Sequence, residues 1–343
     1  MKSFDARLAA IHANPLGAPD FILADAKDAD MGFGLAATGV DPVTGRPRSL
    51  AAFRDQMREI VRQGLVDIML MSASTNDVLT GEGLFAGSSV TPAVRANDST
   101  DIHALTGAPY AGQPSRPLRT PRIDEVIRGG TDLSLYSLTP LGDAERDAAA
   151  LEAYRDFRAE AERAGLRHFL EVFAPNVPVP ITDISRFLND FVARTLAGIP
   201  ASGRPLFLKM PYGGPRVMEE LVAYDPHLVV GVLGGAAGTT HDAFRLVEDA
   251  RRHGARAALF GRKINRSEHQ VTFVRYLRAI ADGQTGAGDA CRWVIRLERL
   301  PDYRVGGVVV PRHRVDMLVD GCSQTDAEAF LERFRRGFLR GGG

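Results

Sequence analysis

The chain has 343 residues, of which 45% are hydrophobic and 24% are charged, and its 42 basic and 42 acidic residues give a formal net charge of zero. A balanced charge without a long basic run interleaved with aromatic residues excludes the electrostatic footprint of a nucleic-acid-binding protein. No stretch approaches the ~18 apolar residues of a membrane span, and residues 1–15 lack the apolar core of a signal peptide. Cys291 and Cys322 lie outside any metal-ligand spacing. We therefore expect two unpaired thiols in a soluble cytoplasmic protein with no nucleic-acid or membrane partner.

Short apolar runs of strand length recur along the chain, and most are apolar at nearly every position. Such runs are typical of parallel strands that are buried on both faces. Amphipathic helical stretches separate most of them. The predicted strands are Phe21–Ala24, Val66–Met71, Val90–Arg95, Leu133–Leu138, His168–Phe173, Leu206–Met210, Leu228–Leu233 and Ala257–Phe260.

The joints between helices and strands repeat one device. Gly64 and Gly165 each follow basic residues at the end of a predicted helix and precede a predicted strand. Glycine adopts the left-handed conformation that ends a helix, and cations suit the negative end of the helix dipole. The repeated units predict an α/β fold, a (β/α)8 TIM barrel over residues 1–283 that forms the catalytic domain. The alternative is an open doubly wound sheet, but no GxGxxG follows the first strand.

Two segments do not fit the repeating unit. The long connection at 96–120 is rich in Gly, Pro and Ser, and it is either a lid over the active site or an ordinary surface insertion. Residues 284–343 form a C-terminal extension, with a small strand pair predicted within 304–321 and an amphipathic helix within 325–340. The extension is expected to pack on the barrel or to lie at a homo-oligomer interface, and the sequence does not decide between the two.

Lysine is rare in this chain, with four lysines against 38 arginines. Three of the four, Lys27, Lys209 and Lys263, lie at or near the ends of predicted strands. In a barrel of this kind the reactive groups lie at the carboxyl ends of the strands. An amine that must lose its proton cannot be replaced by a guanidinium, whose pKa stays above ~12. The scarcity therefore indicates positions where lysine is required for chemistry, above all Lys209.

A lysine within an apolar strand is costly when charged, so burial should lower the pKa of Lys209 toward neutrality. Lys27 is the candidate for a neighbouring cation that would lower it further. A neutral amine can attack a ketone or aldehyde to form a Schiff base, which then stabilises a carbanion on the adjacent carbon. Glu171 and Asp25 are the candidate carboxylates for the proton transfers. The alternative for Glu171 is a structural ion pair with Lys209, although a buried pair is a poor source of stability.

The predicted strands seven and eight are followed by a candidate phosphate site. Gly234 and Gly235 precede a predicted helix, so backbone N–H groups and a helix N-terminus can face an anion. Gly261 and Arg262 at the end of strand eight add an N–H group and a bidentate guanidinium. Barrels frequently bind phosphate between the loops after these two strands. We expect a small-molecule substrate that carries a phosphate.

With these segments the chain resembles the class I aldolase superfamily that includes tagatose-1,6-bisphosphate, archaeal-type fructose-bisphosphate and deoxyribose-phosphate aldolases. The resemblance covers roughly residues 20–283. It implies that Lys209 in FLKMP forms the Schiff base, and that Glu171 in FLEVF and Asp25 in ILADAK are catalytic carboxylates. It also implies phosphate binding by LGGAAGTTHDAF and ALFGRKI, without a cofactor. The second lysine that the tagatose enzymes hold on strand four is absent here, and Lys27 is the hypothetical replacement.

The leading hypothesis is a metal-independent class I aldolase that cleaves a phosphorylated ketose or a related hydroxyketone. A second hypothesis is a metal-assisted lyase in which Asp25, Asp28 and Asp30 hold a divalent cation, although Lys27 stands among them. The third is a non-catalytic barrel that binds a sugar phosphate. Borohydride trapping of a lysine adduct separates the three.

Overall fold

The computed structural model describes residues 1–41, 44–97, 112–235, 238–267, 269–287, 292–305 and 308–320, together with Glu328 and Glu332. Cα proximity divides the chain into two units, Met1–Gly283 and Gln284–Gly343. Cys291, Cys322, segment 98–111 and the helix predicted within 325–340, apart from Glu328 and Glu332, lie outside the described residues. None of the described helices combines the length and the hydropathy that crossing a bilayer would need.

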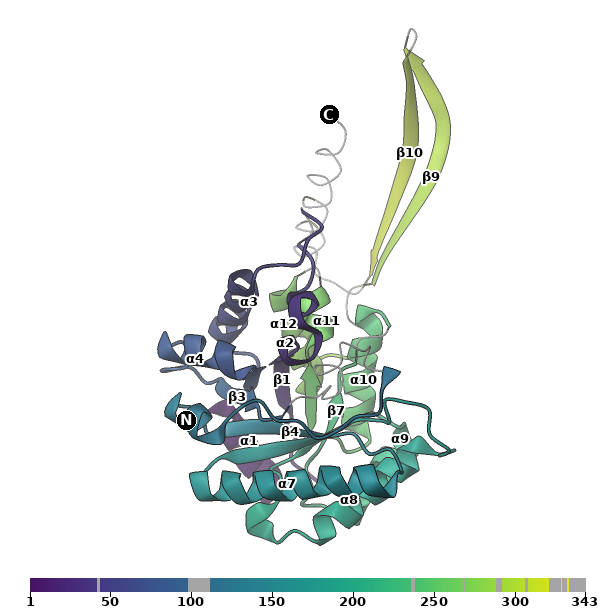
Figure 1. Ribbon diagram of the computed structural model, residues 1–343. Helices are drawn as coiled ribbons and strands as arrows, with labels where there is room; N and C mark the ends of the chain where they lie inside the picture. The colour runs from purple at the N-terminus through teal and green to yellow at the C-terminus, as the bar shows by residue number, and fades with distance from the viewer. Residues whose placement is uncertain are drawn as a thin grey trace. The chain divides into compact units, whose positions relative to one another are not determined.

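The first unit is a closed barrel of parallel strands, which confirms the predicted TIM barrel (Figure 1). Each strand pairs with the next, and β1 pairs with β8 to close the barrel, with Ala24 opposite Leu259. The strands are β1 (Ile22–Lys27), β2 (Ile68–Met71), β3 (Thr91–Arg95), β4 (Leu133–Leu138), β5 (Arg167–Val172), β6 (Leu208–Met210), β7 (Val230–Leu233) and β8 (Ala257–Phe260). All eight overlap the predicted runs, but β1 continues to Lys27 instead of ending at Ala24.

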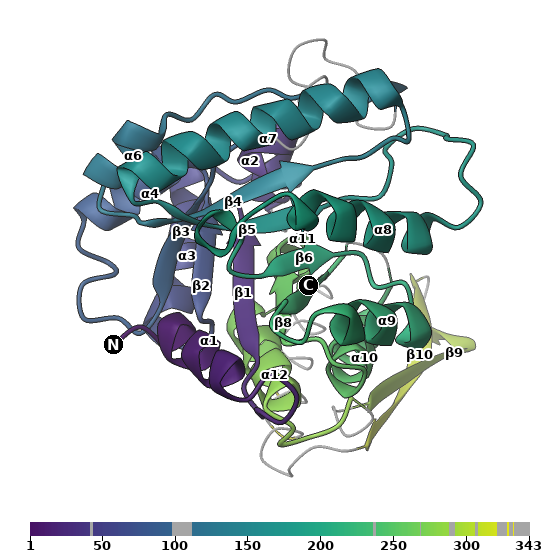
Figure 2. The ribbon, with the colours of Figure 1, turned by 90° about the horizontal axis from the view of Figure 1, so that it is seen from below.

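Helices surround the strands, and α7 lies alongside β4 on the outside of the barrel (Figures 1 and 2). The helices are α1 (Ser3–Ala13), α2 (Asp30–Phe33), α3 (Leu50–Gln63), α4 (Ala73–Gly81), α6 (Ile123–Arg128), α7 (Ala144–Ala164), α8 (Ile184–Ala197), α9 (Pro215–Tyr224), α10 (Thr240–Arg252), α11 (Arg262–Arg266) and α12 (Gln270–Ala281), with 3-10 turns η1 (Gly34–Thr38) and η3 (Ala201–Gly203). Gly64 and Gly165 end α3 and α7 with φ of 71° and 72°, as the joints predicted.

The barrel interior is filled by alternate residues of the strands. Ala24 and Ala26 of β1 belong to one buried cluster with residues from the other strands. Phe4, Leu8 and Ile11 of α1 belong to the same cluster. Helix α1 packs against residues near the starts of the strands, so it covers the amino-terminal end of the barrel interior. The carboxyl-terminal end is not covered by α1 and is available for a functional site.

The second unit contains an antiparallel hairpin of β9 (Arg292–Val305) and β10 (Val308–Asp320). This hairpin is longer than the strand pair predicted within 304–321, because its first strand begins at Arg292. Apolar and charged residue pairs alternate along part of the ribbon: Trp293 pairs with Val319, whereas Arg292 pairs with Asp320. Ile295–Met317 and Leu297–Val315 are further apolar pairs and Arg296–Asp316 and Glu298–Arg314 are charged pairs, whereas Val294–Leu318 departs from the alternation.

Candidate functional site

Lys209 and Glu171 face each other at the carboxyl end of the barrel interior. They lie directly opposite in the register of β5 and β6, and Lys209 Nζ is 2.5 Å from Glu171 Oε1. Their side chains are 7% and 1% exposed. The position follows from backbone alternation, because Phe169 on β5 and Phe207 just before β6, each two residues earlier in the chain, belong to the interior cluster. The structure thus brings together the predicted nucleophile and one predicted carboxylate.

Arg95, the last residue of β3, joins the same cluster and was not among the predicted site residues. Its Nη2 donates to Glu171 Oε2 at 2.8 Å, its Nη1 donates to Ser137 Oγ at 2.6 Å, and its Nε donates to Asp28 Oδ2. The Arg95 side chain is 4% exposed. The signal that could have found it is the one used for Lys209, a cation at the carboxyl end of an apolar strand.

Ser137 on β4 completes the environment of Glu171. Its hydroxyl donates to Glu171 Oε2 at 2.7 Å. Its backbone is held by Asn97, which donates from Nδ2 to the Ser137 carbonyl at 2.9 Å and accepts from the Ser137 N–H at 2.7 Å. In this site β4 therefore contributes the hydroxyl group of Ser137, and the cation besides Lys209 is Arg95 on β3.

The cluster sets the charge of Glu171. Burial alone would raise the pKa of this carboxyl, but attraction to Lys209 and Arg95 and the hydrogen bonds it accepts outweigh burial and lower the pKa below its usual range. Burial opposes the charge of Arg95 as well, and here Asp28 and Glu171 outweigh it, so the pKa of Arg95 is raised. Glu171 is therefore an anion at neutral pH, held between the side chains of Lys209 and Arg95.

Asp25 and Lys27 lie on the other face of β1. Because Ala24 and Ala26 point into the barrel, the residues that alternate with them point toward the surrounding helices. Lys27 Nζ donates to Gln270 Oε1 of α12 at 2.8 Å and lies 5.7 Å from the centre of the Phe53 ring on α3. The structure does not bring these two residues to the Lys209–Glu171 pair. Lys27, the expected cationic neighbour of Lys209, is therefore not part of this cluster, and Arg95 contributes a cation there instead.

Asp25 and Lys27 form a buried pair of their own. Lys27 Nζ is 3.7 Å from Asp25 Oδ2, and both side chains are 0% exposed. Burial is the main cause that raises the pKa of Asp25 to about 6, and attraction to Lys27 only partly offsets it. Burial also lowers the pKa of Lys27. Within the described part of the chain, neither carboxylate oxygen of Asp25 accepts a hydrogen bond.

The three acidic residues of the alternative metal site have different neighbours. Asp25 faces Lys27, Asp28 binds Arg95, and Asp30 accepts a hydrogen bond from Ser72 Oγ at 2.6 Å. Among the described residues, no group of three His, Cys, Asp or Glu side chains is arranged to hold a metal ion. The structure therefore gives the metal-assisted alternative no support.

Gly234 and Gly261, which follow β7 and β8, lie where a larger side chain would collide with its neighbours. A Cβ on Gly234 would lie 2.2 Å from the Phe260 ring, and one on Gly261 would lie 2.2 Å from the Ala26 carbonyl oxygen. Gly235 has a φ of +59°. The Gly234 N–H donates to the Leu259 carbonyl, which holds the ends of β7 and β8 together. The N–H group of Gly234 is thus already used within the sheet.

Arg262 and Lys263 lie at the start of α11. The Arg262 guanidinium is 5.5 Å from the centre of the Phe33 ring, and Lys263 Nζ donates to the Gly238 carbonyl, which links the two predicted phosphate-binding segments. Thr239 and Asp242 form a capping box that occupies the N-terminus of α10. A phosphate in this region would therefore have Arg262 and Lys263 as its cationic partners, because the helix end is already capped by a carboxylate.

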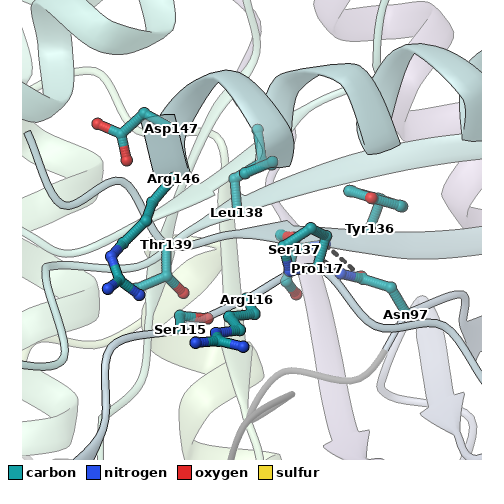
Figure 3. Close-up of a pocket in the computed structure, with 11 residues that line it drawn as sticks. Asn97, Ser115, Arg116, Pro117, Tyr136, Ser137, Leu138, Thr139, Arg146 and Asp147 are labelled. Atoms are coloured by element: carbon teal, nitrogen blue, oxygen red, sulfur yellow. Dashed lines mark hydrogen bonds between the residues drawn. The ribbon is translucent and has the colours of Figure 1, made fainter. Parts of the chain in front are cut away.

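A small pocket of about 20 Å³ lies at the carboxyl end of β4, on the side of the strand that faces α7 (Figure 3). It is lined by Asn97, Ser115, Arg116, Pro117, Tyr136, Ser137, Leu138, Thr139, Arg146, Asp147 and Ala150. Arg116 comes from the segment before α6 and Arg146 from the first turn of α7, with Ser115 and Thr139 between them in this view. Asp147 accepts from the N–H groups of Leu141 and Gly142. The two guanidinium groups would suit a small anion or a water molecule in this pocket.

The barrel is similar to solved structures, although no family model and no curated protein sequence matches the chain. A Schiff-base-forming fructose-1,6-bisphosphate aldolase superimposes with a TM-score of 0.61 at 16% identity, over 80% of this chain and 99% of that one. An archaeal fructose-1,6-bisphosphate aldolase with its catalytic lysine bound to a carbinolamine intermediate gives 0.60 at 17% identity, over 81% and 100%. Cgl0159 from Corynebacterium glutamicum gives 0.58 at 19% identity, over 82% and 94%. At such identities the likeness establishes a shared fold, the (β/α)8 barrel that Schiff-base aldolases also adopt.

Proposed function

We propose that this chain is a class I aldolase in which Lys209 forms a Schiff base with a ketose or hydroxyketone and reversibly cleaves its C–C bond. The contact of 2.5 Å between Lys209 Nζ and Glu171 Oε1 inside the barrel carries the proposal. It gives the amine a proton acceptor within hydrogen-bonding distance, which a nucleophilic lysine needs. Structural neighbours that are Schiff-base aldolases support the proposal.

The proton path runs through Glu171. Lys209 transfers a proton to Glu171 Oε1, and the neutral amine attacks the carbonyl carbon of the substrate. The nitrogen then loses a proton to the former carbonyl oxygen, which gives a carbinolamine. Glu171 returns its proton to the carbinolamine hydroxyl, water leaves, and an iminium remains on Lys209.

Cleavage uses the same carboxylate. Glu171 takes the proton from the hydroxyl on the carbon beta to the iminium carbon as the C–C bond breaks. The bonding electrons move into the iminium to give an enamine, and an aldehyde leaves. Protonation of the enamine carbon and hydrolysis release the second product. Asp25 and Lys27 take no step in this path because their side chains face the helices.

The substrate is proposed to be phosphorylated, with the phosphate near the ends of β7 and β8. Arg262 and Lys263 supply the cations, and Gly235 and Gly261 allow close approach of the backbone.

Borohydride trapping tests the central step. Dihydroxyacetone phosphate and a panel of sugar phosphates are incubated with the protein and reduced, and the modified peptide is identified by mass spectrometry. We expect the adduct on Lys209, and none in Lys209→Arg, because a guanidinium does not form the iminium. Lys2→Arg, whose lysine lies before α1 and donates to the Val90 carbonyl, serves as the matched control and should still be labelled. An adduct on another lysine, or an undiminished adduct yield in Lys209→Arg, would reject Lys209 as the nucleophile.

The phosphate proposal has a separate test. Arg262→Ala should raise the KM of phosphorylated substrates about tenfold or more, because a charge-assisted contact of roughly 1.5–3 kcal/mol is lost. Arg266→Ala, at the far end of the same short helix, is the control. If Arg262→Ala keeps the same preference for phosphorylated over unphosphorylated substrates as Arg266→Ala and the wild type, Arg262 does not belong to the site.

A further inference from the structure

Arg95 uses all three of its guanidinium nitrogens on interior side chains from three other segments of the barrel. They bind Asp28 after β1, Ser137 on β4 and Glu171 on β5. A planar fork with several fixed N–H directions can hold such a set, whereas a lysine ammonium cannot match its geometry. We propose that Arg95 is a positioning residue that keeps Glu171 a carboxylate and turns one of its oxygens toward Lys209. This inference rests on the proposed aldolase function.

The two oxygens of Glu171 have separate roles in this arrangement. Oε2 accepts from Arg95 Nη2 at 2.8 Å and from Ser137 Oγ at 2.7 Å. Oε1 is 2.5 Å from Lys209 Nζ. With Oε2 held by two donors, the carboxylate plane is fixed and Oε1 is left for proton transfer. Asn97 holds the backbone of Ser137 and thereby supports one of the two donors.

Charge gives the second argument. Asp28, Arg95, Glu171 and Lys209 form a buried series of alternating sign in which neighbours are in contact. The cations at Glu171, among the described residues, are Lys209 from β6 and Arg95 from β3, with the Ser137 hydroxyl from β4. When Lys209 is a neutral amine, Arg95 remains the only cation of the series, and its proton stays bound throughout. Without Arg95, burial would favour a protonated Glu171 that cannot accept a proton.

The pH dependence of turnover separates this role from a structural one. For Arg95→Met we expect kcat to fall about 100-fold with KM changed less than about threefold, and the acidic limb of the kcat profile to move up by about one pH unit or more. Arg95→Lys keeps the charge without the fork, so kcat should fall while the limb stays near its wild-type position. Ser137→Ala changes no charge, so a smaller upward shift in that variant reports on Glu171 itself.

Arg278 provides the matched control. It is a buried arginine of α12 that also binds two carboxylates, Asp67 and Asp282, and it donates to the Phe21 carbonyl just before β1 begins. Arg278→Met should lose stability to a similar degree as Arg95→Met but leave the acidic limb unchanged. Thermal unfolding of Arg95→Met and Arg278→Met measures the loss of stability that the two variants are expected to share.

The outcomes are distinguishable. If wild-type protein gives no borohydride adduct at Lys209 with any tested carbonyl, the proposed function fails and Arg95 has no role of this kind. If the adduct forms but neither Arg95→Met nor Ser137→Ala moves the acidic limb, only the role of Arg95 is overturned. A large rise in KM with unchanged kcat would overturn it as well, because Arg95 would then be a substrate-binding residue. If Arg95→Met does not fold, Arg95→Lys and Ser137→Ala still decide the question.

Discussion

Asp25 is a completely buried carboxyl group whose charge has little compensation apart from Lys27. A buried ion pair can cost more in lost hydration than it returns in attraction. We therefore expect the Asp25–Lys27 pair, which lies between β1 and the outer helices, to affect the pH dependence of folding stability. The direction should be opposite to that of most acidic residues.

The sign follows from the folded-state pKa of Asp25, which is raised from 3.8 to about 6. Between these pH values the folded state binds more protons at this site than the unfolded state, so the contribution of Asp25 to stability falls as pH rises. Asp25→Asn removes this dependence. The free energy of unfolding of Asp25→Asn minus that of wild type should therefore increase from pH 4 to pH 6, by at most about 3 kcal/mol. Urea unfolding across this range measures it, and a constant difference would contradict the raised pKa.

Some residues of the site could be identified from the sequence, and others could not. Lys209 and Glu171 were identifiable because a charged residue within an apolar strand is unusual and expensive. Arg95 has the same setting at the end of β3, but it was hidden by the abundance of arginine in the chain. Arg116 and Arg146 could not be linked by sequence at all, because they approach one cavity from separate segments.

At the scale of elements, the strands were predictable and their inward faces were not. A strand buried on both sides carries no alternation of polar and apolar residues, so its sequence does not show which residues face the interior. In β1 this mattered directly. The strand continues through Asp25 to Lys27, and alternation places both side chains toward the helices. A strand ending at Ala24 would have left them in the loop at the barrel mouth.

The junction between β8 and α11 depends on a glycine. A Cβ at Gly261 would approach the Ala26 carbonyl oxygen of β1 to 2.2 Å, which the backbone of the barrel cannot easily relieve. Gly261→Ala should therefore destabilise the fold by about 3 kcal/mol or more. Gly81→Ala at the end of α4 is the control, since a Cβ there meets nothing within 4 Å, and its effect should be below about 1 kcal/mol. Similar melting temperatures for the two variants would contradict the close approach.

At the scale of the whole molecule, the site residues all belong to the unit Met1–Gly283. A chain that ends at Gly283 is therefore predicted to fold and to form the borohydride adduct on Lys209 at a yield within about twofold of the full chain. Circular dichroism and adduct yield, measured side by side on both chains, test this. Loss of the adduct in a folded truncated chain would assign part of the site to residues 284–343.

The pairing of β1 with β8 also has a consequence for synthesis on the ribosome. Ala24 lies opposite Leu259, so β1 can pair with β8 only after almost the entire barrel has been synthesised. At about 5–20 residues per second, the intervening chain takes on the order of 10–50 seconds to emerge. During that time β1 keeps one edge open to wrong partners, including the strands of neighbouring nascent chains. Closure of the ring is thus a late, long-range event, and chaperone dependence of this protein should be greatest just before β8 leaves the exit tunnel.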